Sequence, residues 1–224
     1  LHNPDVVTLD IEMPGMDGLE ALSTIMAEMP RPVVMLSAAG SEADNSLTIR
    51  ALELGAIEFV RKPSGPVSVY LSGIRAEVVR ALTAASVVRV PHSTFTPPAS
   101  LRVERDAFPA REDRGVTPAE SLVVIAASTG GPKALSEVVA HFPENIDAAV
   151  LIVQHMPGDF LASLARRLSQ LGSLPVKVAR HGEPVLSGNA YLAPGDRHMS
   201  VSMQSGVPLV QLDSGPAICG VRPS

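Results

Sequence analysis

A serine followed by two glycines lies where a predicted strand gives way to a predicted helix. The apolar run 122–126 is typical of a buried strand, and Ser128 follows it in the segment Ser-Thr-Gly-Gly-Pro. The glycines permit a tight turn, and the next helix would direct its first backbone amides into that turn. This pattern suits a serine nucleophile whose oxyanion is bound by N–H donors. A phosphate-binding loop and a plain helix N-cap are the alternatives, although Pro132 interrupts the Gly-Lys-Ser/Thr order of a Walker A loop.

A histidine occupies the corresponding place after the next predicted strand. Residues 149–153 form a second apolar run, and His155 follows closely. Because neighbouring parallel strands end at the same edge of a sheet, Ser128 and His155 can meet there. A histidine within hydrogen-bond reach is the base that activates a serine. The other histidines in this half of the chain are His141, His181 and His198. Placement at a strand end favours His155 over these three.

Three polar residues end the predicted strands of the first half of the chain: Asp10, Ser37 and Lys62. Ligands and chemistry gather beyond the carboxyl ends of open parallel sheets. A carboxylate, a hydroxyl and an ammonium there could form a phosphoryl-transfer site in which Asp10 is the nucleophile and the other two stabilise the transferring oxygens. The alternative is structural, because polar residues often end strands and Lys-Pro often terminates one.

Alternating strands and helices must position both sets of residues. Residues 6–82 show three apolar runs, each followed by helical periodicity, which predicts a parallel sheet with right-handed crossovers. Residues 83–118 are rich in proline and in charges of both signs and lack apolar periodicity, as a flexible linker does. The alternation then resumes and closes with a predicted hairpin at about 199–212. We therefore predict an α/β protein with two parallel-sheet domains, 1–82 and 119–224, joined by the linker.

Composition restricts the class of protein. Hydrophobic residues make up 46% of the chain and charged residues 18%, which indicates a packed core. The net charge of −5 argues against a nucleic-acid binder, and the single cysteine excludes an internal disulfide framework. No apolar run reaches the roughly 18 residues that span a bilayer. We expect a soluble, cytoplasmic protein that neither binds nucleic acid nor inserts into a membrane.

The first half of the chain resembles the receiver domains of response regulators. The resemblance is carried by three segments: residues 4–18, residues 51–56 and the pair Lys62-Pro63. It implies a flavodoxin-like fold in which Asp10 accepts a phosphoryl group from a chemotaxis histidine kinase. It also implies that Ser37 is the switch hydroxyl and that Lys62 contacts the phosphoryl group. Mg²⁺ is the implied cofactor of phosphorylation, and Asp10 and Glu12 would supply part of its coordination.

The second half resembles the Rossmann-like catalytic domain of the chemotaxis protein-glutamate methylesterases. The matching segments are residues 127–132, 154–157, 193–199, 215–216 and 222–224. One departure is Ala126, where the family often has glycine. The resemblance implies phosphorylation-regulated hydrolysis of glutamate methyl esters, and deamidation of specific glutamines, on methylated chemoreceptors. Ser128 would be the nucleophile and His155 the general base, with no cofactor for the ester chemistry.

The same resemblance implies that both domains are truncated. The family receiver has five strands and carries its acidic Mg²⁺ ligands after the first, whereas this chain begins just before the expected third. The family aspartate that orients the histidine lies in a later glycine-rich segment, so this third catalytic member is expected to be absent. The remaining candidates are Asp159, Asp196 and Asp213, and none is well placed. We expect such a fragment to be phosphorylated slowly or not at all, to be inactive as an esterase and to be prone to aggregation.

Two functions of other classes compete with this interpretation. One is a non-catalytic response-regulator interaction module that keeps the receiver and has lost the enzyme. The other is a receiver-linked DNA-binding regulator, which the acidic balance and the absence of a helix-turn-helix pattern after the linker disfavour.

Overall fold

The predicted alternation of strands and helices is present in both halves of the molecule. The structure, a computed structural model, describes residues 3–37, 41–62, 67–90 and 117–224. The chain divides into two units, Leu1–Ala99 and Ser100–Ser224. Most of the predicted linker, residues 91–116, lies outside the described residues. None of the helices within the described ranges is long and apolar enough to cross a membrane.

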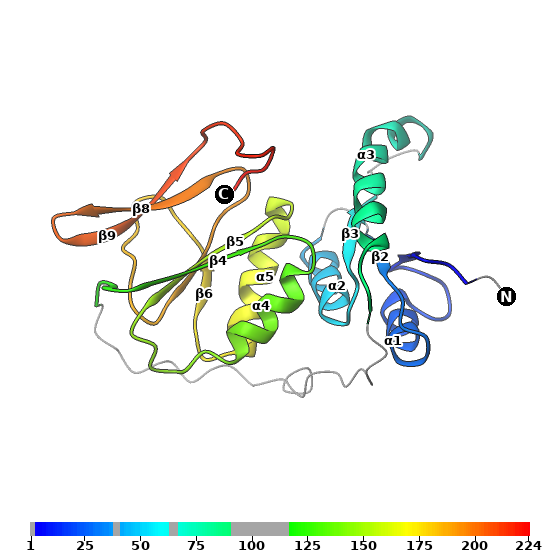
Figure 1. Ribbon diagram of the computed structural model, residues 1–224, viewed down its shortest axis with the longest axis horizontal. Coiled ribbons are helices and arrows are strands. Elements are labelled where there is room, and N and C mark those ends of the chain that lie inside the picture. Colours follow the sequence, from blue (N-terminus) through cyan, green and yellow to red (C-terminus); the bar gives the residue numbers. More distant parts are fainter. Residues whose placement is uncertain (1–2, 38–40, 63–66, 91–116) are drawn as a thin grey trace. The chain divides into compact units, whose positions relative to one another are not determined.

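The first unit is a parallel three-stranded sheet with helices between and after its strands (Figure 1). Its elements are β1 (Val7–Asp10), α1 (Gly18–Glu28), β2 (Val33–Ser37), α2 (Glu42–Glu53), β3 (Glu58–Arg61) and α3 (Val67–Ser86). The strand order is β1-β2-β3, and both pairings are parallel, as predicted. In this register Asp10 lies opposite Leu36, and Ser37 lies opposite Arg61.

Local interactions fix where these helices begin and end. Asp17 caps α1, because its carboxylate accepts a hydrogen bond of 2.8 Å from the backbone N–H of Glu20. Ser41 and Asp44 form a reciprocal capping box at the start of α2, which lowers the pKa of the Asp44 carboxyl. Helix α3 continues to Ser86 rather than ending at residue 82, because the buried Ala85 packs with Val34 and Val60 of the sheet.

The second unit combines a parallel sheet with an antiparallel hairpin (Figure 1). Its elements are β4 (Leu122–Ala127), α4 (Gly131–Ala140), β5 (Ala149–Gln154), α5 (Gly158–Leu171), β6 (Val176–Val178), β7 (Ala190–Leu192), β8 (His198–Gln204) and β9 (Val207–Asp213). The parallel sheet has the order β4-β5-β7-β6, and β8 pairs with β9. Both the parallel sheet and the hairpin agree with the sequence prediction.

Packing on β5 and β7 holds the centre of the second unit rigid. All six residues of β5 are buried, as expected for a central strand of a parallel sheet. One face of the sheet, including Leu151 and Tyr191, packs with Val210 of the hairpin. The Tyr191 hydroxyl donates a 3.0 Å hydrogen bond to the Pro184 carbonyl, and burial raises the pKa of this phenol. The carboxyl end of β5 therefore starts from a fixed position.

Candidate functional site

The carboxyl ends of β4 and β5 bring Ser128 and His155 to one edge of the sheet. Ala127 and Gln154, the last residues of these strands, are direct partners in the parallel register. The backbone N–H of His155 donates a 3.1 Å hydrogen bond to the Ala127 carbonyl. The loops that carry the predicted nucleophile and the predicted base therefore begin side by side, as the sequence pattern indicated.

Ser128 lies in a tight turn that leads directly into α4. Gly130 has a φ of +74°, a conformation that favours glycine, and serves as the N-cap without a side-chain hydrogen bond. The Gly131 N–H donates a 2.8 Å hydrogen bond to the Ser128 carbonyl. Helix α4 begins at Gly131, because proline is tolerated at the start of a helix. The exposed Ser128 side chain lies beside the amide-rich end of the helix.

The His155 ring is held by a neutral backbone group. Its Nε2 lies 2.8 Å from the Pro223 carbonyl oxygen. Because a carbonyl only accepts, Nε2 carries the hydrogen in the neutral ring and Nδ1 keeps the lone pair. Within the described residues, no hydrogen bond joins this ring to Ser128 or to a carboxylate. The structure therefore gathers the two loops, and it also adds Pro223, which sequence reasoning did not assign to the site.

The other histidines of this unit have structural partners. His198 is 8% exposed, and its Nε2 donates to the Pro216 carbonyl at 3.1 Å while its Nδ1 accepts from the Ser224 N–H at 3.2 Å. The bond to Ser224 holds the residue next to Pro223 in place. The ring of His141 hydrogen-bonds the carbonyl of Glu137 within its own helix, and that of His181 accepts from the Leu212 N–H.

The candidate acids occupy structural positions. Asp213 accepts a 2.8 Å hydrogen bond from the Gly215 N–H and so shapes the turn after β9. Asp196 adopts a φ of +58° in the loop before β8, and Asp159 lies in the first turn of α5. That none of these carboxylates orients His155 stays a prediction.

The first unit places two of its three predicted residues in direct contact. Lys62 Nζ lies 2.5 Å from Asp10 Oδ2, and Asp10 Oδ1 accepts a 3.2 Å hydrogen bond from the Glu12 N–H. The side chains of Lys62 and Asp10 are 39% and 30% exposed, so solvent reaches the pair. A partly exposed carboxylate beside an ammonium is chemically suited to accept a phosphoryl group.

Ser37 faces a different partner. Its side chain is fully buried, and its hydroxyl lies 2.7 Å from the Thr48 hydroxyl of α2. Thr48 in turn donates to the Asp44 carbonyl, one turn earlier in the helix. The Ser37 carbonyl also accepts a 2.8 Å hydrogen bond from the Lys62 N–H. Ser37 thus connects the end of β2 both to α2 and to the backbone that carries Lys62, a link with Thr48 that the sequence did not indicate.

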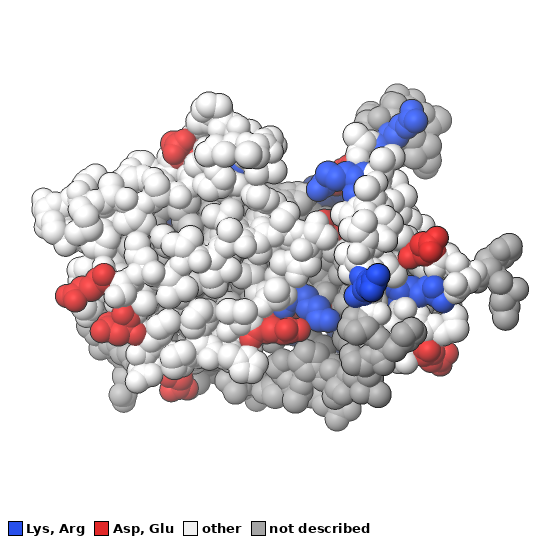
Figure 2. All heavy atoms as spheres, in the orientation of Figure 1, with Lys and Arg blue, Asp and Glu red and all other residues white. Residues whose placement is uncertain are grey.

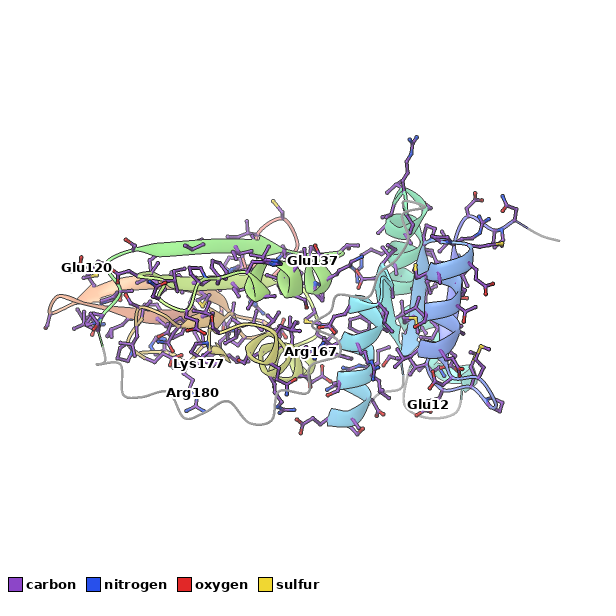
Figure 3. The ribbon with its side chains drawn as sticks, turned by 90° about the horizontal axis from the view of Figure 1, so that it is seen from below. Glu12, Glu120, Glu137, Arg167, Lys177 and Arg180 are labelled. Carbon is purple, nitrogen blue, oxygen red and sulfur yellow. The ribbon has the colours of Figure 1, made fainter. Side chains whose placement is uncertain are left out.

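The described residues contain no cluster of three or more His, Cys, Asp or Glu side chains suited to a metal. Glu12, labelled in Figure 3, lies in the exposed loop after β1, two residues beyond Asp10. Mg²⁺ requires near-octahedral oxygen coordination, much of which water can supply. Asp10 and Glu12 are oxygen donors of the right kind, so they fit part of such a site.

The face of the second unit visible in Figure 2 carries few charged side chains among its described residues, and these are mainly acidic. The electrostatic footprint of a nucleic-acid binder is a dense stripe of lysine and arginine. This face therefore does not have the charge pattern that a phosphate backbone requires.

Two different family models match the two halves of the chain. Residues 1–70 match the response regulator receiver domain, and residues 123–224 match the CheB methylesterase domain. A protein-glutamate methylesterase/protein-glutamine glutaminase of Pyrococcus horikoshii is 43% identical over 221 residues, which are 99% of this chain and 59% of that protein. The protein of the same description from Oceanobacillus iheyensis is 42% identical over 222 residues, 99% of this chain and 62% of its own length.

A solved structure is also similar to part of the chain. The catalytic domain of Thermotoga maritima CheB methylesterase is 44% identical, with 46% of this chain and 55% of that chain covered and a TM-score of 0.45. The chain spans less than two thirds of the length of these curated relatives, 59% and 62% for the two named above.

Proposed function

The chain belongs to the family that joins a response regulator receiver domain to a CheB methylesterase domain, and from this premise we propose that it hydrolyses glutamate methyl esters on chemoreceptors. The observation that carries the proposal is the meeting of the Ser128 turn and the His155 loop at the paired ends of β4 and β5. Residues 119–224 form the proposed catalytic domain, residues 1–82 with the end of α3 form the proposed receiver, and the residues between α3 and 119 form the proposed linker.

The proposed reaction is acyl transfer through Ser128. The Ser128 hydroxyl attacks the ester carbonyl while His155 takes the hydroxyl proton, and backbone N–H groups at the start of α4 stabilise the oxyanion. Methanol leaves with the proton returned by His155. Water then attacks the acyl-serine in the same way, which releases glutamate and restores the serine. A glutamine side chain follows the same course with ammonia as the leaving group, and this accounts for deamidation.

The partner of the His155 ring sets the expected rate. The Pro223 carbonyl can hold the ring and its tautomer, but a neutral oxygen stabilises an imidazolium less than a carboxylate does. In serine proteases, replacing the orienting aspartate by a neutral residue costs roughly 10⁴ in kcat. The sequence alone predicts no esterase activity, whereas the Pro223 contact leads us to propose slow hydrolysis that depends on Ser128 and His155.

The first unit supplies the proposed control. A chemotaxis histidine kinase would donate its phosphoryl group to Asp10, with Lys62 neutralising the transferred oxygens and Ser37 acting as the switch hydroxyl. Receiver domains typically use Mg²⁺ for this transfer, and Asp10 and Glu12 would hold it together with water. Phosphorylation would shift the equilibrium between a closed and an open arrangement of the two domains. Both domains would act in the cytoplasm, on the cytoplasmic part of the chemoreceptors.

Methanol release tests the proposal. The 224-residue chain is incubated at high concentration with a methylated cytoplasmic fragment of a chemoreceptor, and methanol is measured under single-turnover conditions. Slow release above the uncatalysed rate supports the proposed function. Release no faster than in buffer, from protein shown to be folded, would instead favour a non-catalytic interaction module.

A further inference from the structure

A buried glutamine joins the two loops of the candidate active site. Gln154 is the last residue of β5 and is 2% exposed. Its Nε2 donates a 2.9 Å hydrogen bond to the Ser128 carbonyl and a 3.0 Å hydrogen bond to the His155 carbonyl. Both hydrogens of one amide nitrogen thus bind the backbones of the proposed nucleophile and the proposed base.

Chemistry fixes the direction of this amide. Carbonyl oxygens only accept, so the NH₂ group of Gln154 must face them, and the opposite orientation would place Oε1 against two carbonyl oxygens. Oε1 is buried and has no hydrogen-bond partner among the described residues. A buried acceptor without a partner costs free energy, typically about 1–3 kcal/mol. The double donation to the loops is therefore maintained despite that cost.

Gly131 provides the space that this arrangement needs. A Cβ atom added at Gly131 would lie 1.9 Å from Gln154 Oε1. The first residue of α4 must consequently lack a side chain for the Gln154 amide to stay where it is. The packing thus links three features: the end of β5, the Ser128 turn and the start of the helix that offers its N–H groups.

We propose that Gln154 is a positioning residue that clamps the Ser128 turn to the His155 loop. The catalytic role of this clamp rests on the proposed function. The hydrogen bonds themselves are present whatever reaction the site performs. Gln154 is buried, and its two hydrogen bonds go to backbone carbonyls rather than to the proposed reacting side chains. It acts through the backbone of Ser128 and His155, and holds the distance between the nucleophile and its base.

Hydrogen exchange tests the clamp without reference to activity. Gln154→Met keeps the length of the side chain and removes both donors. The matched control is Gln211→Met, which removes a glutamine hydrogen bond of 2.9 Å to Ser202 in the hairpin. We expect Gln154→Met, and not the control, to speed amide exchange at least about tenfold in peptides that cover residues 127–132 and 154–158. Unchanged exchange in both peptides would overturn the proposal.

Reaction with a fluorophosphonate then measures the consequence for Ser128. This probe phosphonylates serine nucleophiles, with fluoride as the leaving group, and does not need the receptor substrate. We expect Gln154→Met to label about tenfold more slowly than the parent chain, because a misplaced nucleophile loses rate steeply with distance. Labelling at the parental rate by folded Gln154→Met would contradict a positioning role.

A second variant serves if Gln154→Met does not fold. In Gln154→Glu a carboxylate would face two carbonyl oxygens and could not donate, whereas the protonated acid could donate to one of them. The labelling rate relative to the parent chain is therefore expected to rise as the pH is lowered from 8 toward 5. A ratio that stays flat with pH would overturn the proposal.

The two proposals fail in different ways. A parent chain that neither labels at Ser128 nor releases methanol contradicts the proposed function, and the exchange comparison of Gln154→Met with Gln211→Met still decides whether the clamp exists.

Discussion

Two sheet edges, one in each unit, hold the proposed reactive groups by different means. At the first edge the reactive groups hold each other, because Lys62 and Asp10 form a direct ion pair of 2.5 Å. At the second edge Ser128 and His155 are held by neighbours, through the Gln154 amide and the Pro223 carbonyl. The carboxyl end of a parallel sheet thus supports both a charged site and a neutral one.

The difference determines which residues can be substituted without removing the reactive side chains of each site. In the first unit, removing a charged side chain removes geometry and chemistry together. In the second unit geometry resides mainly in backbone contacts, so a buried residue such as Gln154 can be changed while Ser128 and His155 stay chemically intact.

Substitution of one glycine in each unit is expected to show the largest difference in stability between the two edges. A Cβ at Gly18 would lie 2.0 Å from the Asp10 carbonyl oxygen, so backbone would have to move, whereas at Gly131 the nearest atom belongs to a side chain. We expect Gly18→Ala to destabilise the first unit by about 3 kcal/mol and Gly131→Ala to destabilise the second by less. Hydrogen exchange, which resolves the two units, measures both. Gly158→Ala is the control, because its Cβ would meet nothing closer than 3.5 Å.

Loss of the proposed nucleophile has the next largest effect. Ser128→Ala is expected to lower methanol release about 100-fold, less than in an enzyme with a complete triad, because the members of a triad act as a unit. Ser200→Ala, an exposed serine on β8, serves as the control and should leave the rate unchanged. Equal rates for the two variants would show that the second edge is not the esterase site.

Phosphorylation probes the first edge in the same manner. Asp10→Asn should lower the incorporation of phosphate from a small phosphodonor and Mg²⁺ at least about tenfold, because an amide is not a competent nucleophile. Intact mass reports the incorporated group, and Asp5→Asn, an exposed neighbour, should behave like the parent chain. Incorporation at the parental level in Asp10→Asn would place the acceptor elsewhere.

The smallest effect concerns two ion pairs of 2.5 Å, one in each unit. Lys62→Met removes the pair with Asp10, and Lys177→Met removes the 2.5 Å pair with Glu183 in the second unit. Because both lysines are partly exposed, each change should cost only about 0.5 kcal/mol of folding free energy. Hydrogen exchange of each unit is the measurement. A loss of several kcal/mol for Lys62→Met alone would mean that the ion pair is a main structural support of the first edge.

The sequence predicted the fold well because the information it needs is local. Apolar runs and helical periodicity repeat every few residues, so the parallel sheets and the hairpin follow from pattern alone, and the helix ends shift by a few residues where capping decides. The ends of the strands also correctly placed Asp10 beside Lys62 and the Ser128 turn beside the His155 loop.

The side-chain contacts that hold the site could not be predicted from apolar runs and helical periodicity. Nothing in the order of residues shows that the Gln154 amide turns back to two carbonyl groups, or that Pro223 returns from 68 residues away to meet His155. The hydroxyl of Ser37 likewise bonds Thr48 because both are buried together, which depends on how α2 packs on β2. Side-chain direction in a packed interior is a property of the tertiary structure.

The most direct test of the account is the site at which a fluorophosphonate attaches to the parent chain. The modified protein is digested, and the adduct is located by mass spectrometry of its peptides. The account predicts a single adduct on Ser128, formed more slowly in His155→Gln, since the base that takes the serine proton is then lost. An adduct on another residue, or none on folded protein, would contradict the claim that the paired ends of β4 and β5 form the catalytic site.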